Sequence, residues 1–137
     1  MSSERPLKAQ ISRFSPSIGF AAGYDDSIRN LQIDRLVAHL QNEPYPYFIA
    51  GDFNTSDQSP SYNRLAAVGI DSFLEVGSGF WMTWPVAAVQ RLPSFVPPLI
   101  RIDYIFHSQG FRALSAHPGS PMGSDHLPLL VTLEQAD

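Results

Sequence analysis

The first strong periodicity of the chain lies between residues 25 and 40, where apolar side chains recur at the spacing of one helical face. These side chains are Ile33, Leu36, Val37 and Leu40. Asp25 and Asp26 stand at the start of the segment, where the positive end of a helix favours acidic side chains. We therefore predict a helix over this segment, stopped by Glu43-Pro44.

A second, shorter helix is predicted from residues that favour helix ends. Ser59 is a good N-cap, and Pro60 suits the first helical position. Tyr62 and Leu65 then share one apolar face, and Gly69 is typical of the residue that follows a helix.

Short apolar or alternating runs predict five strands. They cover residues 47–50, 80–84, 101–106, 111–117 and 127–133. In the third run the alternation places Ile102, Tyr104 and Phe106 on one face and Arg101, Asp103 and Ile105 on the other. Helices come first and strands follow, so we predict an α/β (α+β) fold with a mixed, mostly antiparallel sheet.

Composition limits the class of protein and the kind of metal site. The chain has 137 residues, of which 44% are hydrophobic and 16% charged, enough apolar material for one packed core. It has no cysteine, which excludes disulfides and thiolate ligands. Any metal must therefore bind through oxygen or imidazole, which favours a hard divalent ion such as Mg²⁺.

Charge and hydropathy bear on partners and location. The net charge of −4 disfavours nucleic acid as a partner, because phosphate neutralisation normally needs a basic excess. No apolar run of membrane-spanning length and no signal peptide is recognisable, so a cytoplasmic location is the default expectation. Residues 1–24 are predicted to be a poorly defined segment, and residues 25–137 a single domain.

The first chemical motif is Gly51-Asp52-Phe53-Asn54, where a buried strand becomes a loop. We expect Asp52 and Asn54 to leave the end of the sheet on the same side. A carboxylate and a carboxamide in this arrangement can accept a proton from water and hold that water in line. The same pattern is also an ordinary turn, because both side chains cap nearby backbone groups.

The second motif is Asp103, an acid inside an otherwise apolar strand. Burying it is costly unless a partner is present. One interpretation is a pair with Arg101 or an edge position, and the other is a functional carboxylate. A salt bridge to a neighbouring acid is the default expectation for Arg101.

The third motif is Asp125-His126 at the start of the last predicted strand. Neighbouring side chains of a strand point to opposite sides of its backbone. One of the two can therefore reach a metal while the other meets Asp103. A lone histidine in this position is also commonly structural.

Together and in this order, the three motifs resemble those of the endonuclease/exonuclease/phosphatase superfamily. The helix with Arg29 also resembles the one before that family's Gly-Asp-Phe-Asn strand, and Thr83-Trp84-Pro85 is similar to the bacterial, vancomycin-resistance-type branch. The resemblance covers about residues 25–133. It implies the carboxyl-terminal half of a four-layer α/β/β/α sandwich.

The resemblance also implies a role for each motif residue. Asp52 would accept a proton from the attacking water, and Asn54 would orient that water or a phosphoryl oxygen. His126, held as imidazolium by Asp103, would donate to a non-bridging phosphoryl oxygen. Asp125 would bind Mg²⁺ (or Mn²⁺), and the implied activity is divalent-metal-dependent hydrolysis of a phosphomonoester or phosphodiester.

Substrate recognition is predicted less directly. Trp84 is interpreted as a stacking surface at the rim of the site, or alternatively as a core residue. Substrate choice within the superfamily depends on loops, here the proline-rich segment 86–99. DNA, inositol phosphates, phospholipid head groups and lipid pyrophosphates all remain open as substrates.

The resemblance implies a missing amino-terminal half that supplies an asparagine, a metal-binding glutamate and a histidine or tyrosine. The resemblance also implies an Asn-x-His-like stretch before the arginine helix, but the corresponding residues 13–24 contain no histidine. We therefore expect a fragment, a truncated product or one piece of a split or swapped assembly, whose exposed sheet is covered by an amino-terminal half or by self-association. The alternative function is a catalytically silent remnant that binds a partner chain or a phosphorylated ligand.

Overall fold

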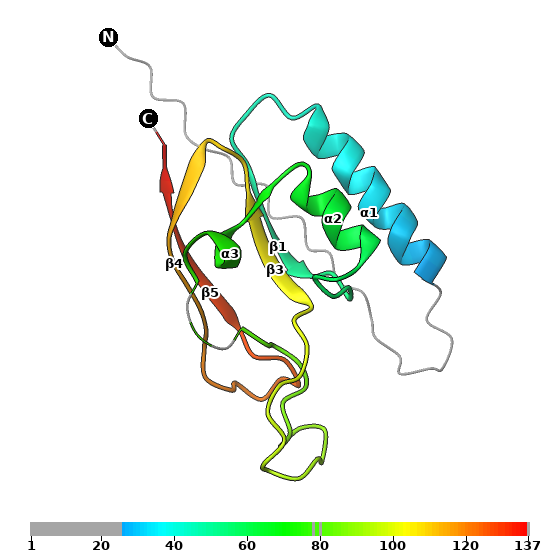
Figure 1. The fold of residues 1–137 in the computed structure, drawn as a ribbon, viewed down its shortest axis with the longest axis vertical. Coiled ribbons are helices and arrows are strands. Elements are labelled where there is room, and N and C mark those ends of the chain that lie inside the picture. The colour runs from blue at the N-terminus through cyan, green and yellow to red at the C-terminus, as the bar shows by residue number, and fades with distance from the viewer. Residues whose placement is uncertain (1–25, 78, 80, 137) are drawn as a thin grey trace.

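The protein is described by a computed structural model that covers residues 26–77, 79 and 81–136, and it has a mixed α/β fold (Figure 1). The predicted segment 1–24, including residues 13–24, lies outside the described residues. The elements are α1 (Asp26–Gln41), β1 (Phe48–Asp52), α2 (Pro60–Ala66), β2 (Ile70–Asp71), α3 (Ser72–Val76), β3 (Asp103–His107), β4 (Phe111–Pro118) and β5 (Leu129–Gln135).

The strands form two groups. β1, β3 and β2 make a three-stranded sheet with β3 in the centre, and β4 pairs with β5 in a two-stranded ribbon. All of these pairings between described strands are antiparallel. Antiparallel order was expected, and four of the five predicted strands are present within two residues of their predicted ends.

The core lies between the three-stranded sheet and the two longer helices. Figure 1 shows α1 and α2 on one side of β1 and β3, with the β4–β5 ribbon and α3 on the other. The core cluster consists of Ile33, Tyr62, Leu65, Tyr104 and Phe106. The predicted apolar faces of both helices are therefore the faces that pack on the sheet. No helix in the described part of the chain is long and apolar enough to cross a membrane.

The helix ends follow from local hydrogen bonding. The side chain of Ser59 accepts a hydrogen bond from the backbone N–H of Tyr62 at 3.1 Å, as expected for an N-cap, and Pro60 follows it. Asp71 caps the short helix α3 in the same way, accepting from the N–H of Phe73 at 3.0 Å. That helix and the two-residue strand β2 were not predicted.

The register of β1 against β3 leaves the second face of the sheet open. Ala50 lies opposite Ile105, and Asp52 lies opposite Asp103, so these four side chains share one face. This face points away from the core. Phe48, two positions before Ala50, is 56% exposed. His107, opposite Phe48 on the same face, is fully buried, and the open face is the part that runs from Ala50 and Ile105 to the two carboxylates.

The predicted strand at residues 80–84 is wrong for its described part. Phe80 lies outside the described residues, and within residues 81–84 only Trp84 forms a β-bridge, an isolated one with Ile100. Pro85 follows directly and has no N–H to extend a ladder, and the partner segment contains Pro97 and Pro98.

The predicted position of Arg101 is also wrong. The strand begins only at Asp103, so the alternation does not extend back to residue 101. Arg101 is 2% exposed and its guanidinium lies 4.6 Å from the ring centroid of Tyr104, on the core side. The expected salt bridge is present, because Nη1 of Arg101 lies 2.7 Å from Oδ2 of Asp71. Removing one partner of such a buried ion pair lowers the stability of the fold by about 3–5 kcal/mol.

Candidate active site

Strand pairing brings two carboxylates together at the end of the open face. Asp52 is the last residue of β1, Asp103 is the first of β3, and the two lie opposite each other in the register. The next backbone hydrogen bond, from the N–H of Phe53 to the carbonyl of Ile102 at 2.9 Å, continues the pairing past the strand ends. Both acid side chains are about four-fifths buried, with 19% of each exposed.

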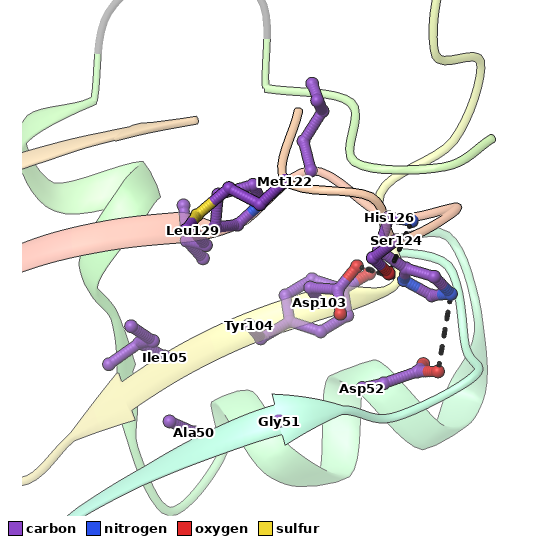
Figure 2. A pocket seen from close by; sticks show the side chains of 12 residues that line it. Ala50, Gly51, Asp52, Asp103, Tyr104, Ile105, Met122, Ser124, His126 and Leu129 are labelled. Atoms are coloured by element: carbon purple, nitrogen blue, oxygen red, sulfur yellow. Dashed lines mark hydrogen bonds and ion pairs between the residues drawn. The ribbon is translucent and has the colours of Figure 1, made fainter. Parts of the chain in front are cut away.

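His126 completes the cluster from the loop that precedes β5. Its Nδ1 lies 2.8 Å from Oδ2 of Asp103, and its Nε2 lies 3.8 Å from Oδ2 of Asp52 (Figure 2). The backbone N–H of His126 donates to the hydroxyl of Ser124 at 3.1 Å, which fixes the loop. The Asp103 contact requires a proton on Nδ1, because a carboxylate only accepts. Nε2 is thereby left facing Asp52.

The charges around His126 favour its protonated form. Burial of the ring opposes protonation, but the hydrogen bond and charge of Asp103, with the charges of Asp52 and Asp125, outweigh it. The pKa of His126 is therefore raised above its ordinary value. The ring can act as a positively charged donor near neutral pH.

The pKa of Asp52 is also raised, and for a carboxyl group this shift disfavours the charged form. Burial raises the pKa of Asp52, and the negative charges of Asp103 and Asp125 add to this. The N–H of Asn54 and the charge of His126 lower the pKa, but by less. A carboxylate with a raised pKa is a stronger base, which suits proton acceptance from water.

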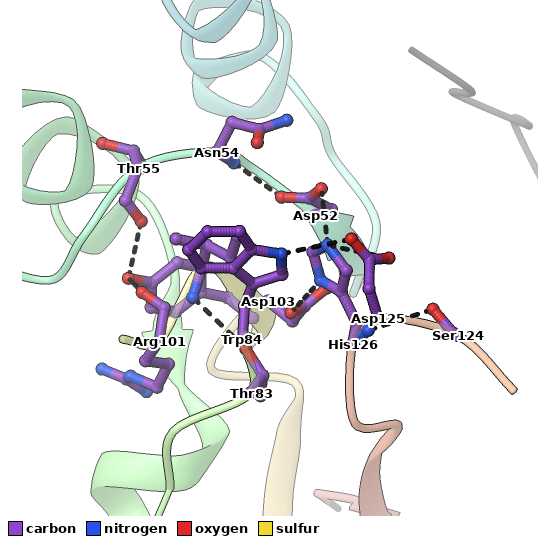
Figure 3. Close-up of polar contacts among 12 residues, drawn as sticks. Asp52, Asn54, Thr55, Thr83, Trp84, Arg101, Asp103, Ser124, Asp125 and His126 are labelled. Carbon is purple, nitrogen blue, oxygen red and sulfur yellow. Dashed lines mark hydrogen bonds and ion pairs between the residues drawn. The ribbon is translucent and has the colours of Figure 1, made fainter. Parts of the chain in front are cut away.

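Asp125 approaches the same ring nitrogen of His126 as Asp52 does, and it is held by Trp84 and the segment that follows it. Its Oδ2 accepts hydrogen bonds from Nε2 of Gln90 at 2.7 Å and Nε1 of Trp84 at 3.3 Å (Figure 3). Its Oδ1 lies 4.0 Å from Nε2 of His126. Burial raises the pKa of Asp125, but the two donors and His126 lower it further, so the net shift is downward. The carboxylate therefore remains charged.

Asn54 shapes the loop rather than entering the cluster. Its backbone has a positive φ of 49°, a conformation that asparagine tolerates, and its N–H donates to Oδ1 of Asp52 at 2.8 Å. Nη1 of Arg29 donates to the carbonyl of Asn54 at 2.7 Å. Figure 3 shows the Asn54 carboxamide on the side of its backbone away from His126. The carboxylate of Asp52 thus caps the backbone of this turn, and the carboxamide of Asn54 lies at the rim.

The predicted site residues lie in one region of the structure, but the distances between them differ. Asp52, Asp103 and His126 have ligand atoms within 4.8 Å of one another, and Asp125 joins them through His126. Trp84 reaches Asp125 instead of lying in the core. Gln90 was not foreseen, because an isolated glutamine in a proline-rich loop gives no sequence signal.

The donor set fits a divalent cation. Three carboxylates surround one imidazole ring; burial, and after it the charges of Asp103 and Asp125, raise the pKa of Asp52. Oxygen donors with this charge are those that Mg²⁺ and Mn²⁺ prefer. Asp125 lies outside the closest group of these donors, and its Oδ1 takes no part in the two hydrogen bonds that its Oδ2 accepts.

Comparison with known proteins identifies relatives over most of the chain. The family model described as "Endonuclease/Exonuclease/phosphatase family" matches residues 6–126. No curated protein matches the chain significantly.

Solved structures share the fold. An endonuclease/exonuclease/phosphatase from Bacteroides vulgatus is 25% identical with a TM-score of 0.60, and the match covers 81% of this chain and 45% of the Bacteroides vulgatus chain. A functionally unknown conserved protein from Enterococcus faecalis has 20% identity and a TM-score of 0.69, and the match covers 82% of this chain and 46% of that protein. A mannosyl-6-phosphatase from Bacteroides thetaiotaomicron has 20% identity and a TM-score of 0.52, and the match covers 77% of this chain and 44% of that protein. The chain thus spans less than half the length of these structures.

The pKa of His126 provides a test of the cluster. Replacing Asp103 with asparagine removes the charge and the hydrogen bond that raise it, so Asp103→Asn should lower the pKa of His126. NMR titration of the ring Cε1–H signal measures this directly. Asp34→Asn, which removes an exposed acid paired with Arg64 on the helical side, is the matched control and should leave the titration unchanged. Equal His126 pKa values in Asp103→Asn and the parent chain would contradict the assigned contact.

Proposed function

The chain belongs to the endonuclease/exonuclease/phosphatase family, and we propose that it carries the acid–base half of a divalent-metal-dependent phosphoesterase. The proposal is supported above all by one observation. A single imidazole lies between Asp103, which holds its proton, and Asp52, which can act as a base.

In the proposed reaction Asp52 activates water. The carboxylate accepts a proton from the water. At the same time the oxygen of the water forms a new bond to phosphorus, and the ester P–O bond breaks. The leaving alkoxide takes up a proton from solvent to give the free alcohol. The raised pKa of Asp52 makes this proton acceptance easier, and general base catalysis contributes about 10²–10⁴-fold in rate. Asn54, at the rim, would orient the water or a phosphoryl oxygen.

His126 stabilises the charge that develops. Its Nδ1–H is held by Asp103, so its Nε2–H is the donor that can be directed at a non-bridging phosphoryl oxygen. A donor fixed before the reaction stabilises that oxygen without reorganising during it. Phosphoryl transfer depends mainly on such positioning and electrostatics.

A divalent cation, Mg²⁺ or Mn²⁺, is proposed as the cofactor, with Asp125 as its ligand. When bound, the ion would act as a Lewis acid toward the phosphoryl group. The role of the protein is to supply the oxygen donor and to keep it oriented. The low pKa of Asp125 keeps that carboxylate charged and ready to bind.

The substrate is proposed to be phosphorylated, and its class is open between monoesters and diesters. The similar Bacteroides thetaiotaomicron protein is named as a mannosyl-6-phosphatase, but at 20% identity it supports a shared fold and not a shared substrate. Trp84, which is half-buried beside Asp125, is proposed to contact the substrate at the rim.

The activity is tested with generic aryl phosphates. In the presence of Mg²⁺ or Mn²⁺ the chain should hydrolyse p-nitrophenyl phosphate or its bis-ester. His126→Ala and Asp52→Asn should each lower kcat by about 10²-fold or more, since each removes a group that acts on the reacting atoms. His39→Ala is the matched control, because the side chain of His39 is 74% exposed on α1, and it should keep full activity. Undiminished turnover in both site variants would refute the assignment.

The alternative function is that of a catalytically silent remnant that binds a partner chain or a phosphorylated ligand. Calorimetry with Mg²⁺ separates the two functions. Absence of ion binding and of turnover, with both restored by an added amino-terminal half, would identify a fragment of an enzyme.

The open face of the sheet is the proposed contact surface for such a partner, or for a second copy of the chain. Phe48 is 56% exposed there, and Ala50 and Ile105 line a groove that continues to the carboxylates. An apolar face of this kind is normally covered in a stable protein. Whatever covers it also borders the active site.

Self-association should therefore depend on this face. In gel filtration with light scattering at several concentrations, the isolated chain should form dimers or larger species, and Phe48→Glu should shift it toward the monomer. Leu31→Glu is the matched control, since Leu31 is 50% exposed on α1, on the opposite side of the sheet. A well-dispersed monomer at all concentrations would contradict the expectation.

A further inference from the structure

Asp125 is more exposed than its neighbours in the site, and yet its carboxylate is fixed in direction. Its side chain is 37% exposed, compared with 16% for His126 and 19% for Asp103. A carboxylate at this exposure rotates freely in water unless donors hold it. Its direction matters because only Oδ1 lies toward Nε2 of His126.

Two donors converge on the other oxygen. Nε2 of Gln90 lies 2.7 Å from Oδ2, and the indole Nε1 of Trp84 lies 3.3 Å from the same atom. The shorter contact belongs to Gln90, so it is the stronger restraint. Figure 3 shows the Trp84 indole beside Asp125.

The segment that carries Gln90 is itself anchored to Asp125. The backbone N–H of Val86 donates to the carbonyl of Asp125 at 2.7 Å, and the N–H of Gln90 donates back to the carbonyl of Val86 at 3.2 Å. This turn positions the glutamine side chain, and Arg91, with a positive φ of 54°, redirects the chain directly after it. Asp125 is therefore held at its backbone and its side chain by one short turn.

We propose that Gln90 is a positioning residue, which fixes the orientation of Asp125 and thereby connects the loop of residues 86–99 to the active site. Gln90 does not contact the reacting atoms. It acts by occupying Oδ2, so that Oδ1 remains directed into the site. A change in the conformation of this loop would change the direction of Asp125. The consequence for catalysis rests on the proposed function, but the positioning itself does not.

The test uses Gln90→Met, which keeps the length and volume of the side chain and removes its donor. If Gln90 positions Asp125, the carboxylate gains freedom and its second hydrogen bond, from Trp84, weakens. The indole N–H of Trp84 should then exchange with solvent at least several-fold faster in NMR hydrogen exchange at equal global stability. Gln109→Met, an exposed glutamine in the turn between β3 and β4, is the matched control and should leave this rate unchanged.

A second readout concerns catalysis. Partners that orient a metal ligand typically contribute about 10–100-fold to metal affinity or activity, so Gln90→Met should lower metal-dependent turnover by that factor. An unchanged Trp84 exchange rate in Gln90→Met would overturn the proposal. If the parent chain has no turnover, the proposed function fails for the isolated chain, while the exchange rates still decide the role of Gln90.

Discussion

The hydrogen bond between His126 and Asp103 joins the three-stranded sheet to the loop before β5, and the chemistry of the site depends on it. Asp103 lies at the first position of the central strand, where its place is fixed by pairing with β1. The imidazole is held through Nδ1, so the other nitrogen must face Asp52. A hydrogen bond to a charged group contributes about 1.5–3 kcal/mol, enough to define both the orientation and the charge of the ring.

The two faces of the central sheet have separate tasks. Tyr104 and Phe106 point into the core with the helices, whereas Asp103 and Ile105 point to the open face. The same alternation that buries the aromatic residues therefore brings an acid to the end of the opposite face. The site requires no special backbone in β3.

Much of the fold follows from the pattern of the sequence. The apolar face of α1, the Ser59–Pro60 helix start and the alternation from Ile102 to Phe106 are all local signals, and the structure shows each of them. What local patterns cannot give is the partner of a side chain. Arg101 leaves the predicted alternation because a buried acid, Asp71, lies 30 residues earlier in the chain and pairs with it.

The candidate site divides in the same way. Its main residues were predicted because three ordered motifs resemble one family, and the structure brings them together. Gln90 could not be predicted, since its contact with Asp125 depends on the path of a loop without periodicity. The strand predicted at residues 80–84 failed because prolines interrupt the ladder that its composition favours. Short elements such as α3 carry too few residues for a period to be recognised.

The central claim is that the carboxylates around His126 form one site for a divalent cation and a phosphoryl group. Paramagnetic Mn²⁺ added to the ¹⁵N-labelled chain tests it most directly, because the ion broadens NMR signals near its binding site. The amide signals of Asp52, Asp125 and His126 should broaden before those of exposed acids such as Asp34 and Glu134. Broadening that begins at other acids, or no preference for these three residues, would contradict it.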